Sequence, residues 1–312
     1  MLSRTADNLF WLARYTERAG NVARGLGVAS RMAAVSARLG DEVAEWRSLL
    51  TASGGEEGFY RKYETPNAES VIHWLVFDPD NSSGILSCFE AARRNARAVR
   101  TALTVDMWEA LNDSWNHLRN LAPDATEGEQ LPNFLGWVQE RVTLFNGAAH
   151  DTMLRNEPWR FVHLGTMLER ADNTARLLDV KHELFAPGEE GAVDYVQWQA
   201  VLRSVSALRS YQWVYRERLS PRRIAELMIL RPELPRSLAA CHAEVADTLE
   251  AIAIGQGSRM GECHRQAGLL KAQLRYGRID DIFEEGLHEF LTGMITRTAE
   301  LGAEIDAFYI KP

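Results

Sequence analysis

Apolar side chains recur every third or fourth residue along most of this 312-residue chain, and strict alternation of apolar and polar residues is nearly absent. On an α-helix this spacing gathers the apolar side chains on one face, whereas a half-buried β-strand requires alternation. The pattern therefore predicts an all-α fold. Hydrophobic residues make up 46% of the chain and include nine Trp, so a chain of this length can build a sizeable core.

Gly, Pro and Ser residues divide the helical pattern into segments. In the first half we expect helices over residues 3–39, 41–53, 67–77, 83–103, 105–121 and 132–155. In the second half we expect them over residues 159–185, 194–210, 221–230, 235–254, 262–276 and 280–309. Asn156 and Ser220, each followed closely by a proline, are residue types that begin helices. Each half is thus expected to contain six helices.

One polar nonapeptide occurs twice. TERAGNVAR covers residues 16–24 and LERADNTAR covers residues 168–176. Because a helix turns by about 100° per residue, the acid, amide and bases of each copy fall on one stripe, with apolar residues mostly opposite. The two stripes and their neighbouring arginines supply nine candidate site residues: Arg14, Glu17, Arg18, Asn21, Arg24, Glu169, Arg170, Asn173 and Arg176.

A second pair of segments points to an internal repeat. FDPDNSSGILSC and LRPELPRSLAAC align Pro79 with Pro232, 153 residues apart, and also align two cysteines. The nonapeptides lie 152 residues apart, so two landmarks recur in the same order at nearly the same offset. We therefore predict a tandem duplication, with repeats over residues 1–156 and 157–312 packed as one pseudo-two-fold helical bundle.

The repeated stripes have several interpretations. A solvated face with weak pairs would explain one copy, but recurrence in register indicates a specific role. If the two helices pack antiparallel, Glu17 faces Arg176 and Arg24 faces Glu169, which forms a clasp between the repeats. Alternatively, the stripes line a polar cleft that holds a carboxylate, phosphate or amine. An exposed surface for a partner protein is the third role.

Other motifs do not indicate a catalytic or metal centre. Glu285-Gly-Leu-His288 has the spacing of one di-iron ligand pair, but such a site needs a second pair, and no other His has Glu three residues before it. We therefore expect no metal and no cofactor. Cys88, Cys241 and Cys263 form no CxxC pair, which suits a reducing compartment, and we expect none to be catalytic. The sequence assigns no catalytic residue.

Charge and hydropathy exclude some classes of partner. The formal net charge of −8 disfavours nucleic acids and anionic membranes, since both repel an acidic surface. Charged residues such as Arg4 and Asp7 interrupt the N-terminal segment, so it lacks the apolar core of a signal peptide. No apolar run approaches the length of about 18 residues that a membrane span needs. We therefore expect a cytoplasmic protein.

The opening MLSRTADNLFWLARYTERAGNVARGL resembles the start of the α-E domain family, bacterial proteins catalogued as a domain of unknown function. Its members begin with Met-Leu-Ser-Arg and continue through an aromatic-Trp, a Gly-Arg-Tyr and a Glu-Arg-Ala-Glu-Asn-x-Ala-Arg. The resemblance extends through FDPDNSSGI and LERADNTARLLDV. Two positions depart from it: Ala13 replaces the usual Gly and Gly20 replaces the usual acid, which Asp172 keeps in the second copy.

The resemblance implies a context. α-E domains are encoded beside, or fused to, circularly permuted ATP-grasp proteins, often near a transglutaminase-like protein, in systems thought to make or modify peptides through amide bonds. By this resemblance we expect a helical accessory or scaffolding partner of an ATP-grasp ligase that binds a peptide or amino-acid substrate. The alternative is an enzyme of the same pathway that acts on an amide or acyl intermediate through the repeated Glu and Arg. The motif has no neighbouring lysine, cysteine or metal cluster in the sequence, which favours the accessory role.

Overall fold

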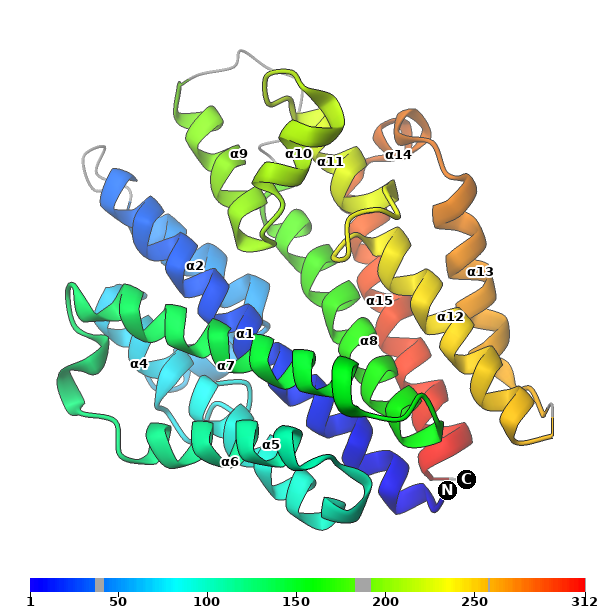
Figure 1. Cartoon of the computed structure of the whole chain (residues 1–312). Coiled ribbons are helices and arrows are strands. Elements are labelled where there is room, and N and C mark those ends of the chain that lie inside the picture. The colour runs from blue at the N-terminus through cyan, green and yellow to red at the C-terminus, as the bar shows by residue number, and fades with distance from the viewer. Residues whose placement is uncertain (37–41, 183–191, 258, 312) are drawn as a thin grey trace. The chain divides into compact units, whose positions relative to one another are not determined.

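The computed structural model describes residues 1–36, 42–182, 192–257 and 259–311. Within these ranges every regular element is helical, so the all-α prediction is confirmed (Figure 1). The chain divides into two compact units, which we call unit 1 (Met1–Thr166) and unit 2 (Met167–Pro312). One helix, α8 (Glu157–Val180), contributes its first residues to unit 1 and the others to unit 2.

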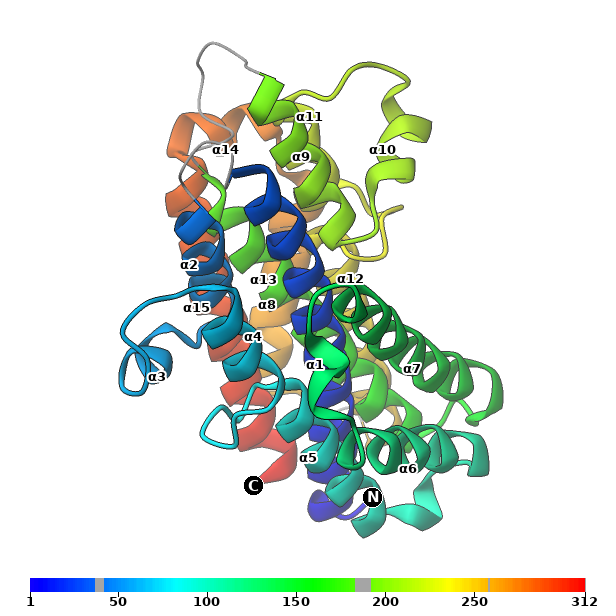
Figure 2. The same cartoon turned by 90° about the vertical axis from the view of Figure 1, so that its left-hand side faces the viewer.

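Unit 1 is arranged around α1. Besides the start of α8, its helices are α1 (Ser3–Ser36), α2 (Glu42–Ser53), α3 (Glu56–Tyr60), α4 (Ala68–Val76), α5 (Ile85–Ala98), α6 (Val105–Arg119) and α7 (Gln130–Thr152), with short 3₁₀ turns at Arg100–Ala102 and Pro123–Thr126. The helices α2, α5 and α7 pack against α1, and α6 packs against α5 and α7 (Figure 2). Leu9, Leu12 and Leu26 of α1 are fully buried. Burying a leucine contributes about 1.5–3 kcal/mol, so the periodic apolar face fixes α1 in this position.

Unit 2 is built from shorter helices. After α8 come α9 (Ala192–Ser204), α10 (Leu208–Tyr215), α11 (Pro221–Leu230), α12 (Leu238–Gly255), α13 (Glu262–Tyr276), α14 (Ile279–Glu285) and α15 (Leu287–Ile305), which ends in a π turn at Asp306–Ile310. The helix α12 packs against α11 and α13, and α13 packs against α15. Cys241, Leu249 and Ile252 of α12 are fully buried.

Helix starts show which sequence signals are used. Asn156 Oδ1 accepts from the Trp159 backbone N–H at 3.5 Å, so the predicted start of α8 is confirmed. Ser220 precedes α11 as predicted, but its side chain makes no capping bond. The helix expected from Pro235 instead begins at Leu238, because Ser237 Oγ accepts from the Ala240 N–H at 3.0 Å.

The expectation of six helices per half is too low for the described residues. The segment expected as a helix over 194–210 breaks at Ser206, whose φ is 59°, and α10 follows. The segment expected over 280–309 breaks at Gly286, whose φ of 108° suits glycine because it has no Cβ. The short helix α3 was also not expected. The ends of the segments predicted over 3–39 and 159–185 lie partly outside the described residues.

A helix that spans a membrane must be both long and apolar. None of the described helices is both long enough and apolar enough to cross a bilayer. The helix α1 has 34 residues but carries Asp, Glu and several Arg along its length.

Candidate functional site

The Glu-Arg motif of unit 1 lies on α1, and part of it faces the interior. Glu17 is 1% exposed and Asn21 is 7% exposed, whereas Arg14, Arg18 and Arg24 are partly exposed. A carboxylate is costly to remove from water unless hydrogen bonds or opposite charges replace its hydration. An ordinary solvated face is therefore excluded for Glu17 and Asn21.

Glu17 meets the neighbouring helix α7. Asn146 Nδ2 of α7 donates to Glu17 Oε2 over 3.4 Å. One turn further along α1, a Cβ built on Gly20 would stand 3.1 Å from Cγ1 of Val142. The missing side chain at position 20 lets α7 approach α1 this closely. An acidic side chain at position 20 would require Val142 to shift by a few tenths of an ångström.

Two motif arginines of unit 1 have different partners: Arg18 contacts a loop, and Arg14 contacts its own helix. Arg18 Nη1 donates to Ser83 Oγ over 3.3 Å, and Ser83 belongs to the loop over residues 77–84 that joins α4 to α5. The guanidinium of Arg14 lies 4.9 Å from the ring centroid of Trp11, a cation–π distance. The motif therefore ties α1 to the 77–84 loop.

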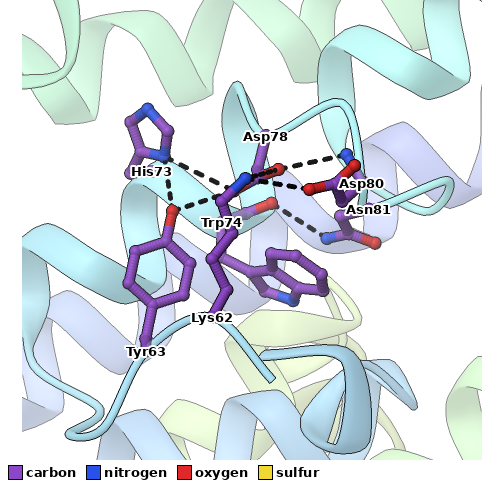
Figure 3. A network of polar contacts seen from close by, with 7 residues as sticks. All are labelled: Lys62, Tyr63, His73, Trp74, Asp78, Asp80 and Asn81. Atoms are coloured by element: carbon purple, nitrogen blue, oxygen red, sulfur yellow. Dashed lines mark hydrogen bonds and ion pairs between the residues drawn. The ribbon is translucent and has the colours of Figure 1, made fainter. Parts of the chain in front are cut away.

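The 77–84 loop is anchored by a buried acid (Figure 3). The side chain of Asp78 is fully buried. It accepts hydrogen bonds from Lys62 Nζ at 2.9 Å and from the Tyr63 hydroxyl at 2.8 Å. The backbone N–H of Asp80 adds a third bond at 3.0 Å. Three donors converge on one carboxylate, so the start of the loop is held firmly against the turn that follows α3.

Further along, the same loop is fixed by an asparagine. Asn81 Nδ2 donates to the carbonyl oxygen of Trp74 at 2.9 Å, and the Ser83 N–H donates to Asn81 Oδ1 at 3.0 Å. Asn81 is 5% exposed. These bonds set the position of Ser83, the residue that Arg18 contacts. The loop therefore acts as a preformed partner for the motif.

The electrostatics of this network favour a permanent ion pair. Burial alone would raise the pKa of Asp78, but the hydrogen bonds from Lys62, Tyr63 and the Asp80 amide outweigh it, so this pKa is lowered. The hydrogen bonds to Asp78 and Asp80 raise the pKa of Lys62. His73 Nδ1 lies 2.9 Å from the Tyr63 hydroxyl at the rim of the network. Asp78 stays ionised and Lys62 protonated at neutral pH, which is the behaviour of an anchor and not of a general acid and base.

The second copy of the motif lies on the part of α8 that belongs to unit 2. Glu169 is 4% exposed, and Arg170 and Asn173 are partly exposed. Arg176 Nε donates to Asp172 Oδ2 at 2.8 Å, one turn earlier on the same helix. The second copy thus uses the acid that position 20 lacks in the first copy.

In each unit the motif helix is tied to a corresponding loop position. Thr174 Oγ1 of α8 donates to the carbonyl oxygen of Arg236 at 2.9 Å. Arg236 lies 153 residues after Ser83, the loop residue that Arg18 contacts in unit 1. The bonding groups differ, but each bond joins the motif helix to a loop, the one before α5 in unit 1 and the one before α12 in unit 2.

Within unit 1 the start of α8 runs alongside α1 in the same direction. The Met1 amino group forms an ion pair with Glu157 at 2.8 Å. Further along both helices, a Cβ on Gly165 would lie 3.2 Å from Cβ of Ala13 and would clash with the Phe10 carbonyl oxygen. The clasp of Glu17 with Arg176 and of Arg24 with Glu169 assumes that the two motif segments pack antiparallel. The second of these segments belongs to unit 2, so the clasp stays a prediction.

The cysteines behave as buried thiols. Cys88 Sγ lies 3.9 Å from the Ser82 carbonyl oxygen, and Cys241 Sγ lies 3.7 Å from that of Pro235. Burial raises the pKa of Cys263 to about 11, although His264 Nδ1 is 3.4 Å from its sulfur. A thiol with a raised pKa is a poor nucleophile at neutral pH.

The Glu285 to His288 motif does not lie on one helix. Glu285 ends α14, Gly286 takes a positive φ, and His288 lies in the first turn of α15. Nδ1 of His288 instead lies 2.7 Å from Asp179 Oδ1 at the end of α8. A signal for this contact existed in the sequence, because Asp179 and His182 repeat the acid-x-x-His spacing with Asp in place of Glu. The acid of this second pair is Asp, so the Glu-x-x-His pattern does not include it.

A surface depression of about 520 Å³ lies elsewhere in unit 1. Arg100, Trp108 and Asn112 are among its lining residues, and the guanidinium of Arg100 lies 4.7 Å from the Trp108 ring centroid. Its lining includes none of the nine motif residues. The depression and the motif are therefore separate features.

The chain has relatives of greater length. It is 25% identical to uncharacterized proteins of Mycobacterium bovis and Mycobacterium tuberculosis, over 97% of this chain and 35% of theirs. The chain thus spans about a third of the length of these curated relatives. No solved structure matches it.

A family profile matches almost the whole chain. The match covers residues 1–310 and describes a predicted alpha-helical domain with a conserved ER motif. The described helices fit the first part of this description, and the Glu-Arg pairs at Glu17-Arg18 and Glu169-Arg170 fit the second. The chain belongs to the Alpha-E family.

Proposed function

We propose that this chain is a helical accessory subunit that organises a peptide- or amide-bond-forming system driven by a circularly permuted ATP-grasp ligase. The observation that carries the proposal is the use of the unit 1 motif for internal contacts: Glu17 meets Asn146 and Arg18 meets Ser83. Side chains that join helices and a loop suit a scaffold better than a catalytic group that must reach its substrate. The ATP-grasp partner is taken from the family resemblance. An ATP-grasp ligase consumes ATP, which agrees with the cytoplasmic location that we propose for this chain.

The length of the relatives supports a role beside another domain. The matched region is 35% of the mycobacterial proteins, so in them an Alpha-E-like region is part of a much longer polypeptide. A region that occurs joined to other sequence is expected to work through contact with it. For this chain we propose the same kind of contact with the ATP-grasp ligase.

We also propose that the chain arose by tandem duplication with pseudo-two-fold symmetry. Cys88 and Cys241, 153 residues apart, both direct their sulfur at the carbonyl oxygen six residues earlier. Ala13 and Gly165 lie 152 residues apart and meet where α1 crosses the start of α8. Contacts between equivalent positions are expected near a two-fold axis.

The competing proposal is an enzyme that acts on an amide or acyl intermediate. A buried carboxylate such as Glu17 or Glu169 can serve as a general acid or base when a substrate displaces its partners. The accessory role is favoured because Cys263, whose sulfur lies 3.4 Å from His264 Nδ1, keeps its proton at neutral pH. A peptide or amino-acid substrate is compatible with both proposals.

The test combines the chain with a circularly permuted ATP-grasp protein of the same organism. Binding is measured by biolayer interferometry, and ADP release is measured across a panel of amino acids. The variants are Glu17→Gln and Glu169→Gln. The matched control is Glu140→Gln, because Glu140-Arg141 is also a Glu-Arg pair but lies outside the motif and exposes its glutamate on α7.

For an accessory subunit, the chain binds the ligase and raises ADP release, and the motif variants lower Tm and binding together. Activity per complex then stays at the wild-type level, and Glu140→Gln has no effect. If Glu17→Gln keeps the fold and the complex but abolishes turnover, the enzyme proposal replaces the accessory one. If the chain neither binds the ligase nor changes ADP release, the proposed partnership is wrong.

A further inference from the structure

Three side chains that commonly bind transition metals meet in unit 2. Asp179 lies in the last turn of α8, His182 lies two residues beyond the end of that helix, and His288 lies in the first turn of α15. One ligand atom from each residue can be chosen so that all three lie within 4.8 Å of one another. Ligands of a tetrahedral zinc ion at about 2.0–2.1 Å lie about 3.4 Å apart, so these side chains would rotate toward one another to bind one ion.

The local fold explains why these residues meet. The aspartate and His182 are three residues apart, a spacing that brings side chains together over one helical turn. Gly286 breaks the preceding helix with a φ of 108°, so α15 begins at Leu287 and carries His288 in its first turn. Without this break, His288 would continue the direction of α14. The glycine therefore places the third residue.

Hydrogen bonds already orient the two imidazoles. Nδ1 of His182 lies 2.6 Å from the Asp179 carbonyl oxygen, which can only accept, so this nitrogen carries the proton. The lone pair of His182 is then on Nε2. Histidine ligands of metals usually donate their other ring N–H to a carbonyl or carboxylate in this way. The tautomer of His182 is therefore the one that a metal at Nε2 requires.

The relation of the rings fits two ligands of one ion. The ring centroids of His182 and His288 lie 4.6 Å apart with planes tilted by 32°. Asp179 Oδ1 lies 2.7 Å from Nδ1 of His288. The carboxylate is 20% exposed and His288 is 50% exposed, so an ion can enter from solvent. The hydrogen bond between Asp179 and His288 does not by itself require a second imidazole, that of His182, to lie beside them.

We propose that Asp179, His182 and His288 form a binding site for a divalent transition metal, with zinc as the best match. Nitrogen ligands favour zinc and its neighbours over calcium and magnesium, which prefer all-oxygen sites. Two histidines and one carboxylate leave a fourth position for water or for a group from a partner or substrate. The ion would join the end of α8 to the start of α15 within unit 2. This site is separate from the Glu-Arg motif and does not depend on the proposed function.

The chain contains a matched control for this proposal. His150 Nδ1 lies 2.9 Å from Asp151 Oδ1, so this pair repeats the Asp–His hydrogen bond. Both side chains are exposed, and the two residues are adjacent on α7 in unit 1. Among the described residues this pair belongs to no group of three ligands. It therefore separates ordinary histidine affinity for metals from a built site.

The experiment titrates the full metal-free chain with Co²⁺ and follows the visible absorption, then displaces Co²⁺ with Zn²⁺. The variants are Asp179→Asn, His182→Gln, His288→Gln and the control His150→Gln. We expect one bound ion per wild-type chain and binding at least tenfold weaker in each of the three site variants. The control should bind like the wild type. Zinc should raise Tm in the wild type and the control, because a ligand that binds only the folded state stabilises it.

Two outcomes would overturn the proposal. One is that the wild-type chain binds no ion in the presence of a tenfold molar excess of Zn²⁺. The other is that the site variants bind the ion as tightly as the wild type while His150→Gln weakens binding. Circular dichroism of each metal-free variant establishes that it folds. Since Asp179→Asn and His288→Gln change exposed or partly exposed positions, one of them is expected to retain the fold.

Discussion

The two units anchor corresponding loops with opposite charges. In unit 1, Asp78 begins the loop and His73 lies five residues earlier, with Nδ1 3.9 Å from the carboxylate. In unit 2, Arg231 begins the loop and Glu226 lies five residues earlier, with Arg231 Nε 3.6 Å from its carboxylate. Each residue of the second pair lies 153 positions after its counterpart. The acid and base have changed places while the spacing is the same.

A tyrosine accompanies the charged loop residue in both units. Tyr63 donates its hydroxyl to Asp78, whereas the guanidinium of Arg231 lies 5.6 Å from the ring centroid of Tyr215. Burial is the main cause that raises the pKa of each tyrosine, and it raises that of Tyr215 to about 12 even though Arg231 opposes it. Both phenols therefore stay protonated at neutral pH.

The units differ in how deeply the charge is buried. The Asp78 side chain is fully buried and has three hydrogen-bond donors, whereas that of Arg231 is 38% exposed. Solvent can replace a lost partner of Arg231 but not of Asp78. The comparison teaches that loop geometry tolerates either sign of charge, while the contribution to stability depends on burial.

The largest difference between the units in the pH dependence of stability is expected at positions 89 and 242, which are 153 residues apart. Phe89 and His242 are both buried, and burial is the main cause that lowers the pKa of His242 to about 4. The unfolded chain then binds more protons than the folded chain between pH 6.5 and pH 4, so stability falls as pH falls through this window. A shift of this size corresponds to a loss on the order of 3 kcal/mol.

The variant His242→Phe copies the unit 1 residue and should remove this acid sensitivity. The measurement is Tm and urea unfolding between pH 7 and pH 4. Carboxylates also titrate in this range, so the informative quantity is the difference between wild type and variant. Equal pH slopes for the two proteins would show that His242 does not control the acid response.

The next effect is expected at the buried acid. Asp78→Asn keeps the shape of the side chain but removes the charge of the carboxylate that accepts hydrogen bonds from Lys62 and Tyr63. It should lower the free energy of unfolding by about 2 kcal/mol. Asp80→Asn is the control, because its carboxylate is 72% exposed and should change stability by less than about 0.5 kcal/mol. The measurement is urea unfolding combined with amide hydrogen exchange in unit 1. Equal effects of the two substitutions would contradict the assigned role of burial.

Position 20 offers a smaller effect that compares the two motif copies. In α8, Asp172 pairs with Arg176, and Gly20→Asp places the same acid at the matching position of α1. The Cβ of the new side chain would stand 3.1 Å from Val142 Cγ1. Overpacking of this kind should destabilise the chain by about 1–3 kcal/mol. Adding Val142→Ala should restore part of that loss if the clash is its cause. Two simply additive losses would indicate that some other strain is responsible.

The smallest effect is expected at the exposed loop base. Arg231→Gln should lower the free energy of unfolding by no more than about 1 kcal/mol, since its ion pair with Glu226 is partly solvated. Salt should weaken this contribution, whereas the Asp78 network should respond less. Urea unfolding at low and high ionic strength provides the measurement. A loss at Arg231 as large as that at Asp78 would remove the distinction between the loops.

Periodicity predicted most of the described helices, but it missed the short helix α3 and some of the breaks between helices. The apolar spacing continues across Ser206 and across Gly286, so the sequence predicts one helix through each position. The structure instead has two helices at each, α9 and α10 around Ser206 and α14 and α15 around Gly286. Glycine permits a positive φ without requiring it, and the nonglycine Ser206 gives no warning of one. The break before α15 is a consequence of how α14 packs on α11 and α15, which is tertiary information.

The motif was predictable as a pattern but not in its environment. The helical angles place Glu17 and Asn21 on one polar stripe opposite the apolar face, whereas both side chains are buried in the structure. Glu17 contacts α7, which is more than one hundred residues away in sequence and packs closely where position 20 has no side chain. The meeting of Asp179 with His288 is likewise a long-range contact. Local spacing does not contain such information.

The tyrosine beside each loop charge has a consequence for how such loops diverge. A phenolic hydroxyl can donate to a carboxylate, as Tyr63 does, and its ring face attracts a guanidinium, as at Tyr215. A neutral partner of this kind suits a residue of either sign. Under the proposed duplication, a loop can therefore exchange acid for base one substitution at a time, with the tyrosine keeping a favourable contact at every intermediate. Reversal of polarity would then not require the fold to be lost and regained.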